Sequence, residues 1–463
     1  MKSRERLTTV VWMIFAIALL AFYTGFNTKL QWRFEERPGF AKYDDLAAAF
    51  LAGQLHLKEK VDPGRLASGD PLNPGLPYPY RFDSIIWDGK YYFQHAPFPA
   101  LIHALWIRLT GLPGQTGFFV VLCSAGTVIV LGLLLGLVRK SSLQDSPSWI
   151  FWYCVASFAL CGPQMYIASR PVVYNEAVCF GALFILAGTA LLARSLVADG
   201  RQLRWLIVAG ACFGAAVTSR AVLIFYPFSF VACYLIWAYK SGRLRPFVGA
   251  QVCAFLSPIA VFVGLLLMYN YLRFGNGLEF GARHIAFPDI LQYRYLTRGG
   301  NFFRLEHMPY QLQHYLFLIP ELTDKFPYFK PPGSSVTEAD VSVIRELVYS
   351  VFLTVPVVIL ALASAIGWNT RAANDNLAPI YTFCIVGPLA QLVVLSCFVR
   401  AAIRYVYDFL PLIFVLVFLG TTAVWKKSSG NTIMRRIVTA GLALLFLGTV
   451  LVGIYYGRVG ALQ

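Results

Sequence analysis

Two adjacent carboxylates, Asp44 and Asp45, lie in the polar stretch 27–96, which separates two strongly apolar segments. A carboxylate that is held in position can take the proton from a hydroxyl nucleophile, so an acidic pair at a boundary between water and lipid is a candidate general base. Acids are also favoured in the first turn of a helix because they complement the helix dipole. The alternative is therefore a capped surface helix without a chemical role.

A second polar cluster lies in the sequence SRPVVYNEAV, which contains Arg170, Tyr174, Asn175 and Glu176 and opens another apolar segment. Ionisable residues at the end of a membrane helix are costly to bury, so they commonly mark a functional site. For Glu176 the alternative is a hydrated acid at the start of a helix. We expect these four side chains at the outer membrane surface.

Further basic candidates are Arg220, between two apolar segments, and Arg404, which precedes Asp408 by four residues. Arginine suits phosphate because its guanidinium can bind two oxygens at once. The spacing of Arg404 and Asp408 places both on one helix face, where they could form an ion pair. Either this pair is purely structural, or Arg404 completes a phosphate pocket and Asp408 orients it.

The elements that must position these residues are membrane helices, because 58% of the residues are hydrophobic and only 13% are charged. A membrane span needs about 20 apolar residues. About eleven segments approach this length, and the first has no small-residue cleavage site, so we expect it to remain a span. The segments are 7–26, 115–138, 149–166, 174–196, 204–219, 221–239, 246–270, 346–367, 378–398, 406–425 and 434–455. The sequence thus predicts an all-α polytopic membrane protein with a single transmembrane domain over 1–463.

The basic residues indicate the orientation of the bundle, since Lys and Arg accumulate in short cytoplasmic loops. Placing the N-terminus in the cytoplasm puts most of the unbalanced positive charge on the inner side. The two large outer loops, 27–114 and 271–345, are then nearly balanced in charge. The net charge of +16 is therefore a topology signal. A nucleic-acid partner is not expected, because the basic residues are scattered over many loops.

Both outer loops are expected to carry helices that lie along the membrane surface. Residues 44–57 and 97–111 are amphipathic or too short to cross the membrane, and 309–329 is rich in aromatic residues. All nine cysteines lie inside predicted spans, so no disulfide framework is implied. The six histidines lie in or beside the outer loops with no metal-binding spacing, and we interpret them as interfacial hydrogen-bonding residues.

Four segments carry a family resemblance: YDDLAAAFLAGQL, WDGKYYFQHAPFPAL, YNYLRFGNGLEFG and RYVYDFLP. Together with the order of spans and loops, they resemble a bacterial branch of the GT-C superfamily of polyprenyl-phosphate-sugar-dependent glycosyltransferases. The resemblance covers most of the chain. Related aminoarabinose-type transferases place an acidic pair ahead of an Arg-Tyr, where this chain has Gly39 and Phe40.

The resemblance implies a GT-C-like bundle that transfers a sugar from a polyprenyl-phosphate donor to an acceptor hydroxyl on the periplasmic or outer face. The acceptor would be a glycan, a lipid or a protein, and the location would be the bacterial inner membrane. The catalytic acid of the superfamily lies in the first outer loop, which points to Asp44 or Asp45. The leaving phosphate would be met by Arg170, Arg220 and Arg404, or by a divalent cation such as Mg²⁺ or Mn²⁺.

The resemblance also places Glu176 beside the metal or the acceptor, so Asp45 and Glu176 are candidate metal ligands. Tyr174, Asn175 and Asp408 are further candidates for a place beside the acceptor or the metal. A separate enzyme that loads the polyprenyl carrier on the cytoplasmic side is implied as well. Two alternatives stay open, a transporter or flippase for a lipid-linked sugar and an inactive membrane scaffold. A carrier would be expected to have polar or broken helices at the bilayer centre. Here the acids lie at the outer rim, which favours the enzyme.

Overall fold

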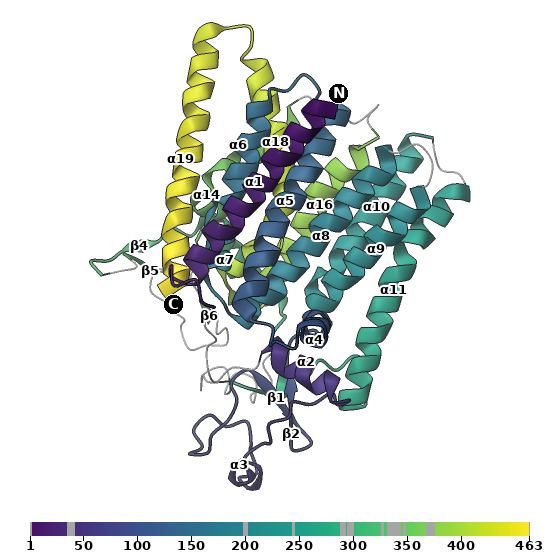
Figure 1. Ribbon diagram of the computed structural model, residues 1–463, viewed down its shortest axis with the longest axis vertical. Coiled ribbons are helices and arrows are strands. Elements are labelled where there is room, and N and C mark those ends of the chain that lie inside the picture. The colour runs from purple at the N-terminus through teal and green to yellow at the C-terminus, as the bar shows by residue number, and fades with distance from the viewer. Residues whose placement is uncertain are drawn as a thin grey trace.

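A computed structural model describes residues 2–34, 42–197, 202–242, 246–287, 293, 301–325, 328–330, 344–345, 349–366 and 376–462. Gly39 and Phe40 lie outside these ranges. Long helices form a bundle, and the first outer loop lies across the end of it that is lower in Figure 1. The long helices are α1 (Lys2–Asn27), α5 (Thr116–Ser142), α8 (Val173–Val197), α9 (Gln202–Ser219), α10 (Phe225–Lys240), α11 (Pro246–Phe274), α16 (Ala378–Ser396), α18 (Leu410–Lys427) and α19 (Thr432–Leu462).

Eight helices in these ranges are long and apolar enough to cross a membrane, which confirms a multi-pass, all-α membrane protein. The predicted span 149–166 is a bent pair, α6 (Ser148–Ala159) and α7 (Gly162–Ser169), which meet at 48° and would make a ninth span. The predicted span 204–219 belongs to α9, one of the shorter apolar helices. The exact number of eleven remains a prediction.

The predicted span 346–367 does not form one α-helix. Its described part folds as α14 (Val351–Thr354) followed by the 3₁₀ helix η4 (Pro356–Ala365). Pro356 has no amide hydrogen and its ring clashes with the preceding turn, so an α-helix cannot run through it undisturbed. The packing of η4 against α18 is close, and Gly420 of α18 lies directly against the carbonyl oxygen of Leu360.

The first outer loop contains α2 (Tyr43–Leu51), α3 (Pro63–Ala67), α4 (Phe98–Thr110) and a hairpin of β1 (Ser84–Trp87) and β2 (Lys90–Phe93). Asp88 and Gly89 turn the hairpin with positive φ angles of 49° and 67°, as a tight turn between paired strands requires. On its other side β1 pairs antiparallel with β3 (Ile285–Ala286). The first and second outer loops therefore meet in one three-stranded sheet.

Helix α4 has the two faces expected of a helix at the membrane surface. Leu101, Leu105 and Leu109 are spaced one turn apart and are exposed, whereas Ala100 and His103 on the other face are fully buried. The buried face lies against α2 and the ends of α8 and α9 (Figure 1). This arrangement places His103 inside the protein, between α4 and the helices against which α4 packs.

The described part of the second outer loop contains α13 (Met308–Phe317), the 3₁₀ helices η2 (Ala282–His284) and η3 (Leu305–His307), and the strands β4 (Glu321–Leu322), β5 (Phe329–Lys330) and β6 (Ile344–Arg345). The helix predicted over 309–329 is thus confined to its first part. Strand β6 pairs in parallel with β7 (Arg400–Ala401), just before the short helix α17 (Ile403–Val406). The second loop is thereby tied to the segment that carries Arg404.

A buried polar network fixes α7, which leads into the start of α8. Gln164 donates to the hydroxyl of Tyr23 at 2.9 Å and to the carbonyl oxygen of Ser124 at 3.1 Å, and it accepts from the hydroxyl of Tyr407. These contacts join α7 to α1, α5 and the segment before α18. Satisfied buried hydrogen bonds of this kind specify one arrangement of helices, because breaking any of them leaves an unpaired polar group.

Candidate active site

The first part of the site is an acid cluster of Asp44, His103 and Glu176, which come from α2, α4 and α8. The ring nitrogen Nδ1 of His103 lies 2.7 Å from Oδ1 of Asp44, and Nε2 contacts Oε1 of Glu176. The side chains of His103 and Glu176 are fully buried. Because a carboxylate only accepts hydrogen bonds, both ring nitrogens must carry a proton, and His103 is an imidazolium.

The environment of His103 supports this protonation state. Burial alone would lower its pKa, but the charges of Glu176 and Asp44 and the hydrogen bonds to them outweigh burial and raise the pKa to about 9. Asp44 is held further by the amide of Gly114, which donates to Oδ1 at 2.9 Å. A side chain at Gly114 would collide with both Asp44 and His103. The cluster is therefore assembled from three helices and one close backbone approach.

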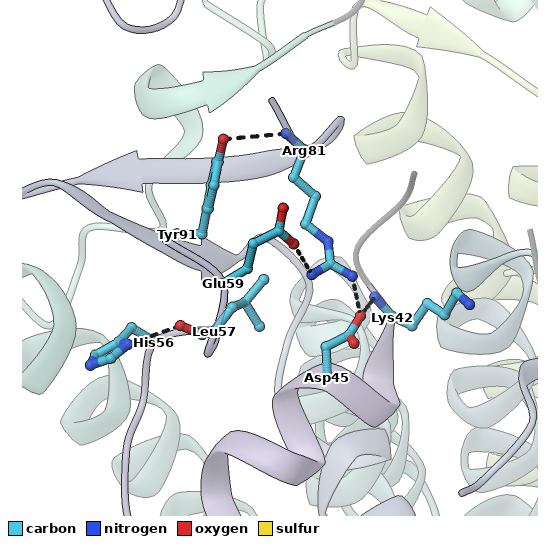
Figure 2. Close-up of polar contacts among 7 residues, drawn as sticks. All are labelled: Lys42, Asp45, His56, Leu57, Glu59, Arg81 and Tyr91. Atoms are coloured by element: carbon cyan, nitrogen blue, oxygen red, sulfur yellow. Dashed lines mark hydrogen bonds and ion pairs between the residues drawn. The ribbon is translucent and has the colours of Figure 1, made fainter. Parts of the chain in front are cut away.

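Asp45 faces another direction from Asp44. Its Oδ2 accepts from the amide of Lys42 at 2.9 Å, which caps α2, and lies 2.5 Å from Nη2 of Arg81. Nη1 of Arg81 lies 2.7 Å from Glu59, so the guanidinium bridges two carboxylates (Figure 2). Burial raises the pKa of Asp45, and Arg81 acts in the opposite direction. The two predicted catalytic acids thus belong to different networks.

The second part of the site is a cluster of side chains in mutual contact, named the arginine pocket for the anion that it is proposed to bind. It consists of Arg220, Arg404, Asp408, Tyr174 and Tyr405. Nε and Nη2 of Arg220 lie 2.8 and 2.7 Å from Oδ2 of the buried Asp408. The expected ion pair of Asp408 with Arg404 stays a prediction, although the charge of Arg404 acts on Asp408. Helix α17 ends at Val406, so the chain turns before Asp408 and the two residues do not share a helix face.

Two guanidinium groups contact the same aromatic ring in this pocket. The Cζ atoms of Arg220 and Arg404 lie 4.8 and 5.0 Å from the ring centre of Tyr405, and Arg404 also lies 4.8 Å from the ring of Tyr174. The hydroxyl of Tyr174 donates to Asp83 of the first outer loop. The aromatic rings hold the arginines by cation–π contacts at the outer end of the bundle.

His95 lies beside this pocket, with its ring centre 5.2 Å from that of Tyr174. Desolvation of the ring and the positive charges of Arg220 and Arg404 lower the pKa of His95 to about 3. His95 is therefore neutral at physiological pH. The charges of Arg220 and Arg404, which add to the effect of desolvation, act on the ring of His95 and would favour an anion beside it.

The structure does not join every predicted residue to these two groups. The side chain of Arg170 contacts the hydroxyl and ring of Tyr166, and the amide of Asn175 donates to the backbone oxygen of Arg170 at 3.1 Å. These contacts stabilise the turn between α7 and α8. The assignment of Arg170 to the phosphate and of Asn175 to the acceptor stays a prediction.

The arrangement of donors can be compared with the needs of a divalent cation. Glu176 is bound to His103, whereas Asp45 is bound to Arg81, so the two predicted metal ligands lie in separate networks. Within the described ranges, no group of three His, Cys, Asp or Glu side chains is placed to hold a metal ion. The protonated ring of His103 fills the space between Asp44 and Glu176. In the part of the chain that the structure describes, the donor atoms therefore do not match a metal site, and a divalent cation stays a prediction.

Sequence reasoning missed His95 and His103 as site residues, because neither has a recognisable spacing to its partners. Asp44 is 59 residues and Glu176 is 73 residues from His103. One signal was present in the sequence. His103 follows the small Ala100 by three residues, on the helix face opposite the leucines, which indicates a buried histidine.

Comparison with known proteins supports the fold. No family model matches the chain, and no curated protein matches it. The solved structure of the oligosaccharyltransferase AglB from Archaeoglobus fulgidus, in complex with an inhibitory peptide and a dolichol-phosphate, is similar over 98% of this chain, with 12% identity and a TM-score of 0.50. ArnT from Cupriavidus metallidurans, bound to undecaprenyl phosphate, matches 98% of this chain and 76% of its own, with 13% identity and a TM-score of 0.48.

This chain spans 56% of the length of AglB. At such low identity the likeness shows the fold alone, a bundle of membrane helices similar to that of the AglB structure, and this agrees with the fold that the sequence motifs predicted.

Proposed function

We propose that this chain transfers a sugar from a polyprenyl-phosphate donor to an acceptor hydroxyl at the periplasmic face of a bacterial inner membrane. The observation that carries the proposal is the placement of an arginine pocket and a buried acid cluster at the same end of a GT-C bundle. Such a transfer requires a site that binds the phosphate anion and a group that accepts the proton of the acceptor hydroxyl. The acceptor is a glycan, a lipid or a protein, and a separate enzyme loads the carrier on the cytoplasmic side.

Arg220 and Arg404 bind the donor phosphate in this proposal. Their guanidinium groups are held by Tyr405, and the side chain of Arg220 is 17% exposed, so it can reach a ligand while paired with Asp408. A phosphate at the membrane surface needs such compensation, because an unpaired charge beside lipid is costly. The same groups stabilise the negative charge that develops on the phosphate as the sugar leaves.

Asp44 is the proton acceptor. Its contacts with the described residues, from Gly114 and His103, all use Oδ1, which leaves Oδ2 for the acceptor hydroxyl. The acceptor oxygen forms a bond to the anomeric carbon, the bond from that carbon to the phosphate oxygen breaks, and the proton passes to Asp44. The polyprenyl phosphate keeps the electron pair. Asp45 orients the start of α2 through Lys42 and Arg81.

The positive charge between Asp44 and Glu176 comes from His103. This imidazolium contacts both carboxylates and so holds α2, α4 and α8 together. The donor atoms of the described residues do not match a divalent cation, and the imidazolium of His103 supplies positive charge in its place.

The test is mass spectrometry of surface glycans and polyprenyl-phosphate sugars in a deletion strain. The strain is complemented with wild type, with Asp44→Asn, or with Asp145→Asn as a control, because Asp145 lies in the loop between α5 and α6 and its side chain is 91% exposed. We expect a sugar to disappear from the glycan and its lipid-linked form to accumulate, with rescue by wild type and the control only. Full rescue by Asp44→Asn would exclude this carboxylate as the base.

A further inference from the structure

Tyr43, the first residue of α2, has a buried hydroxyl with no hydrogen-bond partner among the described residues. Its side chain is 0% exposed. Buried hydroxyls are nearly always paired, because an unpaired one loses its bonds to water without compensation. A group outside the described chain is therefore expected to pair with it.

The position of Tyr43 links the two parts of the site. Its ring centre lies 6.0 Å from that of His103 in the acid cluster and 6.3 Å from that of His95 beside the arginine pocket. An edge-to-face contact with Phe93 at 4.8 Å fixes the ring. The phenol also experiences the charges of Glu176 and Arg220, which belong to opposite halves of the site.

The hydroxyl of Tyr43 is a donor at physiological pH. Burial and the nearby charge of Glu176 raise the pKa of Tyr43 well above its usual value, and Arg220 acts in the opposite direction. His103 contacts Oδ1 of Asp44 and Oε1 of Glu176. Oε2 of Glu176 is buried without a partner among the described residues, so the Tyr43 hydroxyl does not donate to it. An anion bound at Arg220 would supply the missing acceptor, because phosphate oxygens accept hydrogen bonds from neutral hydroxyls.

We infer that the Tyr43 hydroxyl donates a hydrogen bond to a phosphate oxygen of the polyprenyl-phosphate donor bound by Arg220 and Arg404. This inference rests on the proposed function and adds a binding residue to it. Tyr43 is adjacent to Asp44, so the bond would fix the distance between the phosphate and the proton acceptor. The competing explanation is a trapped water molecule, which would need further polar partners of its own.

The experiment measures binding of undecaprenyl phosphate to the full-length chain in detergent micelles, with undecaprenol as the competitor that lacks the phosphate. Tyr43→Phe removes the hydroxyl and keeps the ring. Tyr456→Phe in α19 is the matched control, because its hydroxyl is also buried without a partner among the described residues, beside Tyr166 and Tyr349. We expect Tyr43→Phe to bind undecaprenyl phosphate about 10-fold more weakly, as for loss of a hydrogen bond to a charged group.

The outcomes separate the inference from the proposed function. If wild type binds undecaprenyl phosphate, Arg220→Lys weakens binding and Tyr43→Phe binds as wild type does, the hydroxyl pairs with water and only the inference fails. If undecaprenol competes as well as undecaprenyl phosphate does, there is no phosphate site and both fail. The unfolding midpoint of each variant without lipid is measured as well. An unchanged or higher midpoint for Tyr43→Phe with weaker phosphate binding supports the inference.

Discussion

Nδ1 of His103 lies 2.7 Å from Oδ1 of Asp44, while the opposite edge of the same ring contacts Glu176. One imidazolium thus neutralises part of the charge of two carboxylates in a buried site. Removing the cation would leave the carboxylates facing each other, and breaking a buried ion pair from one side is strongly destabilising. His103 therefore contributes to the stability of the outer end of the bundle and holds the proposed base in position.

The raised pKa of His103 predicts a pH dependence of stability. A group whose pKa is higher in the folded than in the unfolded chain stabilises the fold fully at pH values below its unfolded pKa, and this stabilisation is lost as the pH rises through its folded pKa. For His103 the unfolded pKa is about 6.5 and the folded pKa is about 9. We expect the midpoint temperature of unfolding of the detergent-solubilised protein to decrease as the pH is raised from 7 to 10. The midpoint of His103→Gln should already be lower at pH 7, and it should not show this decrease with pH. Parallel curves for the two proteins would contradict an imidazolium at this position.

The two loop aspartates should differ in their effect on transfer. Asp44→Asn removes the proposed proton acceptor, so we expect transfer to fall by at least about 100-fold, in line with general-base catalysis. Asp45→Asn keeps a hydrogen-bond acceptor for Lys42 and loses only the charge opposite Arg81, so we expect a smaller decrease. Transfer assays in proteoliposomes with equal amounts of each variant measure this. The reverse order would assign the base to Asp45.

The sequence predicted the residue types of the site better than their partners. Glu176 and Arg220 were recognisable because charged residues stand out at the ends of apolar segments, and Asp44 because it belongs to an adjacent acidic pair in a polar loop. Their contacts depend on how α2, α4 and α8 pack, which no local spacing records. Asp408 was expected to pair with Arg404 one turn away, and the partner that no local spacing indicated is Arg220, from a distant segment. Helix-period rules apply only within a continuous helix.

The fold was predicted in the same uneven way. Hydropathy identified the long helices, because a span needs only length and apolar composition. It could not tell an α-helix from the 3₁₀ helix η4, since both are apolar and differ only in hydrogen bonding. It also gave no sign that β3 of the second loop would pair with β1 of the first loop. Pairing between strands that are distant in the sequence depends on how the whole chain packs, which local sequence patterns do not record.

The ion pair of Arg220 and Asp408 allows phosphate binding to be separated from stability. Arg220→Ala leaves the buried carboxylate of Asp408 uncompensated, so we expect a loss of about 3–5 kcal/mol in unfolding free energy as well as loss of undecaprenyl phosphate binding. The double variant Arg220→Ala/Asp408→Asn removes the unpaired charge. It should regain much of the stability without regaining binding. Recovery of phosphate binding in the double variant would exclude Arg220 as the phosphate ligand.

Helix α19 offers a prediction that tests its packing in the bundle. Gly453 lies directly against the carbonyl oxygen of Leu160, at the bend between α6 and α7, so a methyl group there must push the helices apart. We expect Gly453→Ala to lower the unfolding free energy by about 1–3 kcal/mol, as overpacking generally does. Gly441→Ala in the same helix is the matched control, because no atom lies within 4 Å of the added methyl group. That change should stabilise the helix by about 0.5–1 kcal/mol. Equal unfolding midpoints for the two variants would show that α19 does not pack against Leu160.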